Sequence, residues 1–139
     1  MRKRGLYVLA MRLKSGRTIR VGKLGVFDFP AGIYLYVGSA WGYGGLAARL
    51  RRHLALAGTD VENPHWHLDY LLPFIEIVGV VTFPGKRSEC ALVEKLAQNP
   101  DVERFPLGFG AADCRCKGHL LFLQGEKGPE PPESQGGAI

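Results

Sequence analysis

The pattern of hydrophobic and polar positions predicts five strands, as short apolar, β-prone stretches at residues 5–13, 18–21, 32–38, 75–83 and 120–123. Residues 15–17 have turn chemistry, so the second stretch is expected to pair back onto the first. The fourth stretch is rich in β-branched residues and suits a central strand. Within the third stretch, the alternation places Tyr34, Tyr36 and Gly38 on one face of the sheet.

A period of three to four residues predicts helices at residues 45–57 and 89–98, with a shorter helix at residues 65–72. In the first helix we expect a core stripe made of Leu46, Leu50, Leu54 and Ala57. Together, the strands and helices predict an α/β or α+β fold in which a small mixed or antiparallel sheet is flanked by helices.

The chain of 139 residues has the length of one domain, which we expect to span residues 1–123. Residues 124–139 are mainly Gly, Pro, Glu, Gln and Ser and have little to bury, so they predict a disordered tail. No apolar run reaches the roughly 20 residues that cross a bilayer, and no membrane partner is expected.

Positive charge is concentrated in the first part of the chain. Residues 1–58 contain eleven lysines and arginines but a single acid, Asp28, whereas the remainder carries more acids than bases. The whole chain has a formal net charge of +5 at pH 7. A basic half of this kind indicates a polyanionic partner, nucleic acid before membrane.

The chain has three cysteines, and this odd number argues against a disulfide framework. Cys114 and Cys116 are too close in sequence to bridge without strain. We therefore expect reduced thiols and a cytoplasmic location. Cys114, Cys116 and His119, with His65 and His67 elsewhere, offer ligand types for a structural zinc ion. The C-x-C spacing is tighter than zinc sites commonly use, so buried thiols are the favoured interpretation.

The most informative stretch runs from Tyr36 to His53 and contains a strand end, a glycine-rich turn at residues 39–45 and the start of a helix. Arg49 and His53 are four residues apart in this helix, so their side chains share one face. A guanidinium group and an imidazole beside a strand that carries tyrosine suit an anionic substrate. The planar fork of arginine matches two oxygens of a phosphate.

Three short motifs occur in order along the chain, namely Gly5-Leu6-Tyr7, Tyr36-Val37-Gly38 and Arg49-Leu50-Arg51-Arg52-His53. In this combination the chain resembles the GIY-YIG nuclease superfamily. Gly32-Ile33-Tyr34 matches the name of the family literally, but it lies on the same predicted strand as the second motif. Because the family places its two motifs on separate strands, the earlier Gly-x-Tyr is assigned as the first motif.

Other motifs, at residues 65–71, 108–110 and 113–120, are similar to a branch of GIY-YIG-like domains. Some members of this branch are fused to endonuclease III-type DNA repair enzymes. The resemblance implies a metal-dependent endonuclease that hydrolyses phosphodiester bonds in DNA during repair or processing. It also implies DNA as a partner, with a DNA glycosylase or another repair enzyme as a further partner.

The resemblance implies catalytic roles for four residues. Arg49 would bind the phosphate, and His53 would bind the phosphate or a catalytic tyrosine. Tyr7 and Tyr36 are candidates for activating water. A phenol has an ordinary pKa of about 10, so a tyrosine that acts as a base needs a cation or metal nearby. Further candidates for binding the substrate are Ser39, Arg52 and His67.

The metal ligand of the family is a glutamate on a later helix, where it would hold Mg²⁺ or Mn²⁺. Glu89 and Glu94 both lie on the helix predicted at residues 89–98. Glu89 directly precedes Cys90, as in the branch that the chain resembles, whereas Glu94 fits the more usual placement in the superfamily. We choose Glu89 and keep Glu94 as the alternative.

Two other classes of protein stay open. One is a catalytically inactive nucleic-acid-binding module with the same fold, because Leu6 replaces isoleucine in the first motif. The other is a zinc-binding accessory domain built on Cys114, Cys116 and His119. The turn at residues 39–45 is longer than the usual connection of the family, so we expect it to influence substrate choice.

Overall fold

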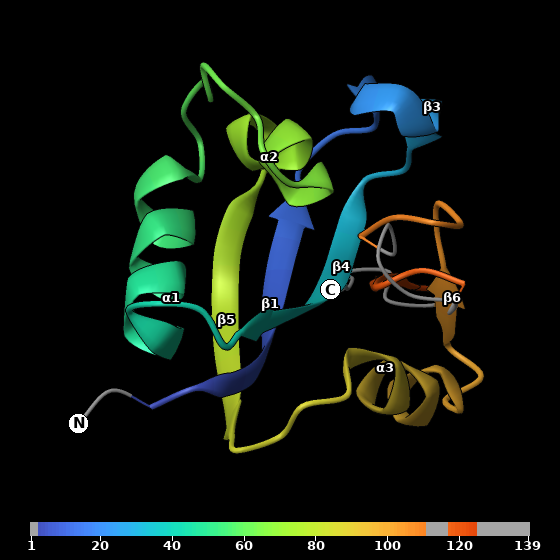
Figure 1. Ribbon diagram of the computed structural model, residues 1–139. Coiled ribbons are helices and arrows are strands. Elements are labelled where there is room, and N and C mark those ends of the chain that lie inside the picture. Colours follow the sequence, from blue (N-terminus) through green and yellow to red (C-terminus); the bar gives the residue numbers. More distant parts are fainter. Residues whose placement is uncertain (1–2, 111–116, 125–139) are drawn as a thin grey trace, which may run out of the picture.

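A computed structural model describes residues 3–110 and 117–124 of the chain (Figure 1). The strands are β1 (Gly5–Leu13), β2 (Arg17–Val21), β3 (Gly25–Phe29), β4 (Gly32–Ala40), β5 (Glu76–Pro84), β6 (Val102–Arg104) and β7 (Leu120–Leu123). The helices are α1 (Gly45–Leu56), α2 (His67–Leu71) and α3 (Glu89–Ala97), with 3-10 turns at Gly22–Leu24 and Leu72–Phe74.

Five strands form one antiparallel sheet in the order β5-β1-β4-β7-β6, and β1 lies between β5 and β4 (Figure 1). This arrangement confirms the prediction of an α+β fold with helices around a small antiparallel sheet. The strands at 5–13 and 32–38 are also confirmed, and they pair directly with each other along their length. The two predicted motif strands are therefore neighbours.

The two faces of the sheet bury separate hydrophobic clusters. One face carries Tyr7, Leu9 and Tyr36, which pack with Leu46 of α1 and Leu68 of α2. Because alternate residues of a strand point to opposite faces, their chain neighbours lie on the other side. The larger cluster holds α1 and α2 over the ends of the two motif strands.

The second face of the sheet is covered by α3. Here Val8 of β1, Val37 of β4 and Leu121 of β7 pack with Val93 of α3. The side chains of all four are less than 10% exposed. This packing holds α3 against β4. It thereby fixes the position of Glu89, the first residue of the helix.

The predicted pairing of residues 18–21 with the first strand is wrong. This segment is β2, and it pairs with β3 in a separate two-stranded sheet. The buried side chains Ile19, Val21 and Phe29 join the larger hydrophobic cluster, and β2 also contacts α2. The hairpin is folded over one end of the core because these apolar side chains are buried there and not beside β1.

The predicted central position of residues 75–83 is also wrong. In the part of the chain that the structure describes, β5 is an edge strand. Its Val78, Val80 and Val81 are 44%, 39% and 55% exposed. A run of β-branched residues favours a strand but does not determine how many neighbours the strand has.

Helix α1 lies where it was predicted, but its buried face differs. Leu46 is buried, whereas Leu54, expected in the core stripe, is 52% exposed. His53 takes the buried position and is only 1% exposed. The helix is therefore turned so that a polar ring faces the sheet, and this ring has a partner there.

Cys90 is disulfide-bonded, so the expectation of reduced thiols is wrong at this position. Cys114, Cys116 and the predicted tail beyond residue 124 lie outside the described residues. Among residues 3–110 and 117–124, no three His, Cys, Asp or Glu side chains are grouped to hold a metal ion. Within the same ranges, no helix has the length and apolar character needed to span a membrane.

Candidate active site

The pairing of β1 with β4 sets Tyr7 directly opposite Gly38. A Cβ atom added to Gly38 would lie 2.4 Å from the Cζ and Oη atoms of Tyr7. The tyrosine ring therefore occupies the space that any side chain at position 38 would need. This contact gives a physical reason for the glycine that ends the Tyr36-Val37-Gly38 motif.

Tyr7 is hydrogen-bonded to His53, with 2.8 Å between its Oη atom and Nε2 of the imidazole. Burial, aided by the charges of Arg49 and Arg52, lowers the pKa of His53 to about 4, so the ring is neutral at pH 7. Its Nδ1 atom is buried and has no hydrogen-bond partner among the described residues. The neutral phenol and the neutral imidazole each carry one proton that can be donated, so the tautomer of the ring decides which of the two donates this hydrogen bond.

The two motif tyrosines lie side by side, with 6.3 Å between their ring centroids. Burial raises the pKa of Tyr7 to about 12, although the nearby positive charge of Arg49 acts in the opposite direction. Burial also raises the pKa of Tyr36 well above its ordinary value, and Tyr7 and Glu89 add to this shift. Both phenols are consequently neutral at pH 7.

Helix α1 begins close to the N-terminal segment. Gly45 has a φ of +65°, and a Cβ atom there would lie 2.3 Å from the carbonyl oxygen of Lys3. The backbone N–H of Leu46 donates to the same oxygen at 2.9 Å. The positive φ and the closeness of the Lys3 oxygen both require a glycine at the first position of the helix. This start fixes the rotation of α1, and with it the direction of Arg49 one turn later.

The guanidinium group of Arg49 is held from two sides. Its Nη1 atom donates to the backbone oxygen of Ser39 at 2.8 Å. Its Cζ atom lies 4.3 Å from the ring centroid of Trp66, a cation–π contact. Because the guanidinium group has five N–H donors, these contacts can orient it and still leave donors for an anion.

A cavity of about 320 Å³ opens beside Arg49. It is lined by Tyr36, Ser39, Trp41, Gly42, Arg49, Trp66, Glu89 and Gly110. Three residues with predicted roles in catalysis, Tyr36, Arg49 and Glu89, thus meet at one place from β4, α1 and α3. Tyr7 and His53 are buried and do not line the cavity. Tyr7 packs against Tyr36, and His53 packs against Trp66.

Glu89 is the first residue of α3, which Ser88 caps by accepting a hydrogen bond from the Ala91 backbone at 3.0 Å. The Glu89 side chain is 28% exposed, and its Oε1 atom lies 3.4 Å from Nδ1 of the buried His119. Burial lowers the pKa of His119, and the charge of Arg104 adds to this, so the neutral ring can donate to the carboxylate. Glu89 is the only carboxylate among the described residues that line the cavity.

Glu94, the alternative metal ligand, lies elsewhere. Its Oε2 atom is 2.6 Å from Nη2 of Arg104, and its side chain is 62% exposed. It does not line the cavity that contains Arg49 and Tyr36. The structure therefore brings Glu89 to the other site residues and leaves Glu94 at the surface.

Arg52 forms a bidentate ion pair with Asp69, at 2.8 and 3.0 Å. The Asp69 side chain is fully buried, and its Oδ2 atom also accepts from the backbone N–H groups of His65 and Trp66. Burial alone would raise the pKa of Asp69, but these hydrogen bonds, led by that of Arg52, lower it below its ordinary value. Through its bond to the Trp66 backbone, Asp69 holds the indole against the guanidinium group of Arg49. Arg52 therefore supports the site without lining the cavity.

Asp69→Ala is expected to reduce the free energy of unfolding by about 3 kcal/mol or more, because Arg52 and two backbone N–H groups lose their acceptor. Urea denaturation followed by circular dichroism measures this effect. Glu76→Ala is the matched control, since the Arg12–Glu76 pair is about half exposed and should contribute less than about 1 kcal/mol. Equal effects of the two substitutions would contradict the structural role of Asp69.

The structure does not bring His67 to the cavity. Its Nδ1 atom accepts a hydrogen bond from the backbone N–H of Gly110 at 2.8 Å, and its ring packs against Phe109. Burial lowers the pKa of His67. His67 therefore holds the loop that carries Gly110, which itself lines the cavity.

Two residues that line the cavity, Trp41 and Trp66, have no role predicted from the sequence. Asp69 does not line the cavity and holds Arg52 in place. An acidic residue three positions after the start of a helix is a common capping signal, and it could have identified Asp69 as a structural residue. Trp66 lies in a loop, and its sequence context carries no signal for contact with Arg49.

The buried His53 predicts a pH-dependent stability. Its pKa is about 4 in the folded protein and about 6.5 when exposed, so the unfolded chain binds the extra proton. Stability should therefore fall as the pH decreases from about 6.5 to about 4, by roughly 2–3 kcal/mol for this group. His67 and His119 add to the same slope, so the test compares His53→Gln with the wild-type protein in urea unfolding across this range. An unchanged slope would contradict the assignment.

Comparison with known proteins identifies the family of the chain. The family model described as "Domain of unknown function DUF123" matches residues 6–133, and the chain belongs to this family. No curated protein and no solved structure matches the chain. The matched region includes every residue assigned to the candidate site.

Proposed function

We propose that this protein is a metal-dependent endonuclease of the GIY-YIG type that hydrolyses phosphodiester bonds in DNA. The observation that carries the proposal is the convergence of Tyr36, Arg49 and Glu89 on one cavity from β4, α1 and α3. Tyr7 and His53 are joined by a hydrogen bond and pack against two residues that line this cavity, Tyr36 and Trp66. A phenol, a guanidinium group and one carboxylate can position water, bind a phosphate and hold a divalent cation, which are tasks in the hydrolysis of a phosphodiester.

In this proposal Arg49 binds the scissile phosphate through N–H donors that its contacts with Ser39 and Trp66 have already oriented. Tyr36 is the motif tyrosine that reaches the cavity, so it positions the attacking water. Tyr7 packs against Tyr36 and is held in position by its hydrogen bond with the neutral His53. Burial raises the pKa of both phenols, and the charge of Arg49 acts in the opposite direction.

The residues present fit a divalent cation such as Mg²⁺ or Mn²⁺. Mg²⁺ is commonly bound by one or two carboxylates together with water and the phosphate oxygens of a substrate. Glu89 offers one partly exposed carboxylate in a cavity that also contains the proposed phosphate ligand. When bound, the cation would activate water and stabilise the leaving oxygen.

We further propose that the enzyme acts in DNA repair or processing, together with a DNA glycosylase or another repair enzyme. The basic first half of the chain supports binding of DNA. We place the activity in the cytoplasm.

A cleavage screen tests the proposed function. Purified protein is incubated with labelled single-stranded, duplex, flap, branched and abasic DNA, and with RNA, in the presence of Mg²⁺, Mn²⁺ or EDTA. The proposal predicts cleavage of at least one DNA substrate that depends on the divalent cation. Salt-sensitive binding without cleavage of any substrate would favour the inactive nucleic-acid-binding module instead.

A further inference from the structure

The two tryptophans of the chain line the same cavity. Trp41 follows β4 in the glycine-rich turn, and Trp66 precedes α2, so the two indoles come from segments that are distant in sequence. Neither is fully buried. Phosphate chemistry alone requires no indole, so their presence beside Arg49 needs a separate explanation.

Trp41 is held in place from two sides. Its Nε1 atom donates to the backbone oxygen of Lys86 at 2.9 Å. The Cζ atom of Arg87 lies 3.8 Å from its ring centroid. An indole held by a hydrogen bond at its edge and by a cation on its ring loses little freedom when a second flat group stacks on it.

Trp66 forms part of another wall of the cavity, and more arginine side chains stack on its ring than on that of Trp41. The Cζ atoms of Arg49 and Arg52 lie 4.3 and 4.7 Å from its ring centroid. Two guanidinium groups therefore already occupy the surface of this ring. Trp41, with one stacked arginine, is the better platform for a ligand.

We propose that the cavity accepts an unpaired nucleobase of the DNA substrate, stacked on Trp41, while the adjacent phosphate binds Arg49. This inference rests on the proposed nuclease function and specifies its substrate as single-stranded DNA or a nucleotide displaced from a duplex. A base inside an intact duplex is stacked on its neighbours and cannot offer its face to an indole. Stacking on aromatic side chains is how proteins hold single strands without reading their sequence.

The size of the cavity agrees with this ligand. At about 320 Å³ it lies at the lower end of the range of ordinary small-molecule sites, roughly 300–1,000 Å³. It therefore has room for a flat ring system next to a phosphate but not for a double helix. Its charged lining groups, Arg49 and Glu89, suit the phosphate and its cation and not the base.

Binding in EDTA tests the inference without cleavage. Labelled oligothymidylate and a blunt duplex of equal length are titrated with protein and followed by fluorescence anisotropy. The single strand is expected to bind at least about tenfold tighter, and Trp41→Leu should weaken its binding by about 5- to 100-fold. Trp41→Phe should retain most of the affinity because it keeps an aromatic face.

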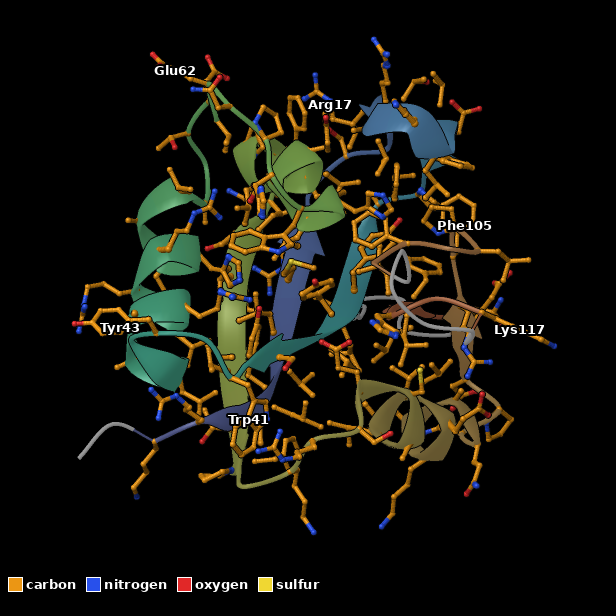
Figure 2. All side chains as sticks on the ribbon, in the orientation of Figure 1. Arg17, Trp41, Tyr43, Glu62, Phe105 and Lys117 are labelled. Atoms are coloured by element: carbon orange, nitrogen blue, oxygen red, sulfur yellow. The ribbon has the colours of Figure 1, made fainter. Side chains whose placement is uncertain are left out.

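Phe74→Leu is the matched control. The Cζ atom of Arg17 lies 4.0 Å from the Phe74 ring centroid, so this pair repeats the arginine–aromatic contact away from the cavity. Arg17 lies at the opposite end of the molecule from Trp41 (Figure 2). The control should bind oligothymidylate as the wild-type protein does.

Two results would overturn the inference: equal affinity for single strand and duplex, or wild-type affinity in Trp41→Leu. Neither result concerns cleavage, which is measured separately with Mg²⁺. Absence of cleavage together with Trp41-dependent binding of single strands would overturn the nuclease proposal and support the base-binding site. The two failures are therefore distinguishable.

Discussion

Arg49→Ala is expected to slow phosphodiester cleavage by about 10²–10³-fold, while DNA affinity changes by less than about tenfold. The Ser39 backbone and Trp66 orient the guanidinium group at the cavity, so in the proposed reaction it would stabilise charge that develops on the phosphate in the transition state. Binding should persist because many other basic residues would still be available to contact the DNA backbone. Single-turnover cleavage with Mg²⁺ and anisotropy in EDTA measure the two quantities separately.

Arg51→Ala is the control for this prediction, since Arg51 lies on the same helix but is exposed to solvent. It should cleave at a rate close to that of the wild-type protein. Arg49→Lys should remain strongly impaired, because an ammonium group cannot reproduce the planar fork of a guanidinium group. Equal rates for Arg49→Ala and Arg51→Ala would contradict the assignment of Arg49.

Glu89→Gln is expected to reduce cleavage at least about 100-fold and to weaken binding of Mn²⁺ measured by isothermal titration calorimetry. The amide removes the only carboxylate found among the described residues that line the cavity, and a hard cation needs an anionic oxygen ligand. The substitution keeps the size of the side chain, so its effect on the fold should be small. Thermal unfolding without metal checks this point.

Glu94→Gln separates the metal site from a general effect of charge on α3. Glu94 is mostly exposed and paired with Arg104, so its loss should leave Mn²⁺ binding and cleavage within about twofold of wild type. If Glu94→Gln were the more damaging of the two, the metal ligand would have to be reassigned. Retention of Mn²⁺ binding by Glu89→Gln would have the same consequence.

Much of the fold could be predicted from the sequence because local patterns determine it. The two motif strands are apolar, β-prone stretches and α1 has a helical period, and the structure confirms all three elements. The pairing of β2 could not be predicted in the same way. Whether a short strand joins the sheet or folds over the core depends on which apolar surface is uncovered, and this is not a local property.

The candidate site was predicted in part. The i, i+4 spacing places Arg49 and His53 on one side of α1, but it does not predict that His53 is buried while Leu54 is exposed. His53 can take the buried position because the Tyr7 hydroxyl group gives the imidazole a hydrogen-bond partner inside the core. Sequence patterns describe apolar burial well and buried polar pairs poorly, because such a pair joins residues from distant segments.

The ion pair between Arg52 and Asp69, which helps to hold Trp66 against Arg49, is a partly buried polar pair that the sequence pattern also does not predict. Arg52 and Asp69 are 17 residues apart, on two helices joined by a loop, and no periodic signal links them. From the sequence, Arg52 is a candidate for binding the substrate. Its bidentate bond to a buried carboxylate instead gives it a positioning role.

The measurement that tests the central claim most directly is a side-by-side single-turnover cleavage assay on a labelled DNA substrate. It compares the wild-type protein, Arg51→Ala, Arg49→Ala and Glu89→Gln, each with Mg²⁺ and with EDTA. We predict that the first two cleave DNA only with Mg²⁺, and that both cavity variants are at least about 100-fold slower. Equal rates in all four proteins, or no cleavage by the wild type of any substrate in the screen, would contradict the proposal that this cavity is a nuclease active site.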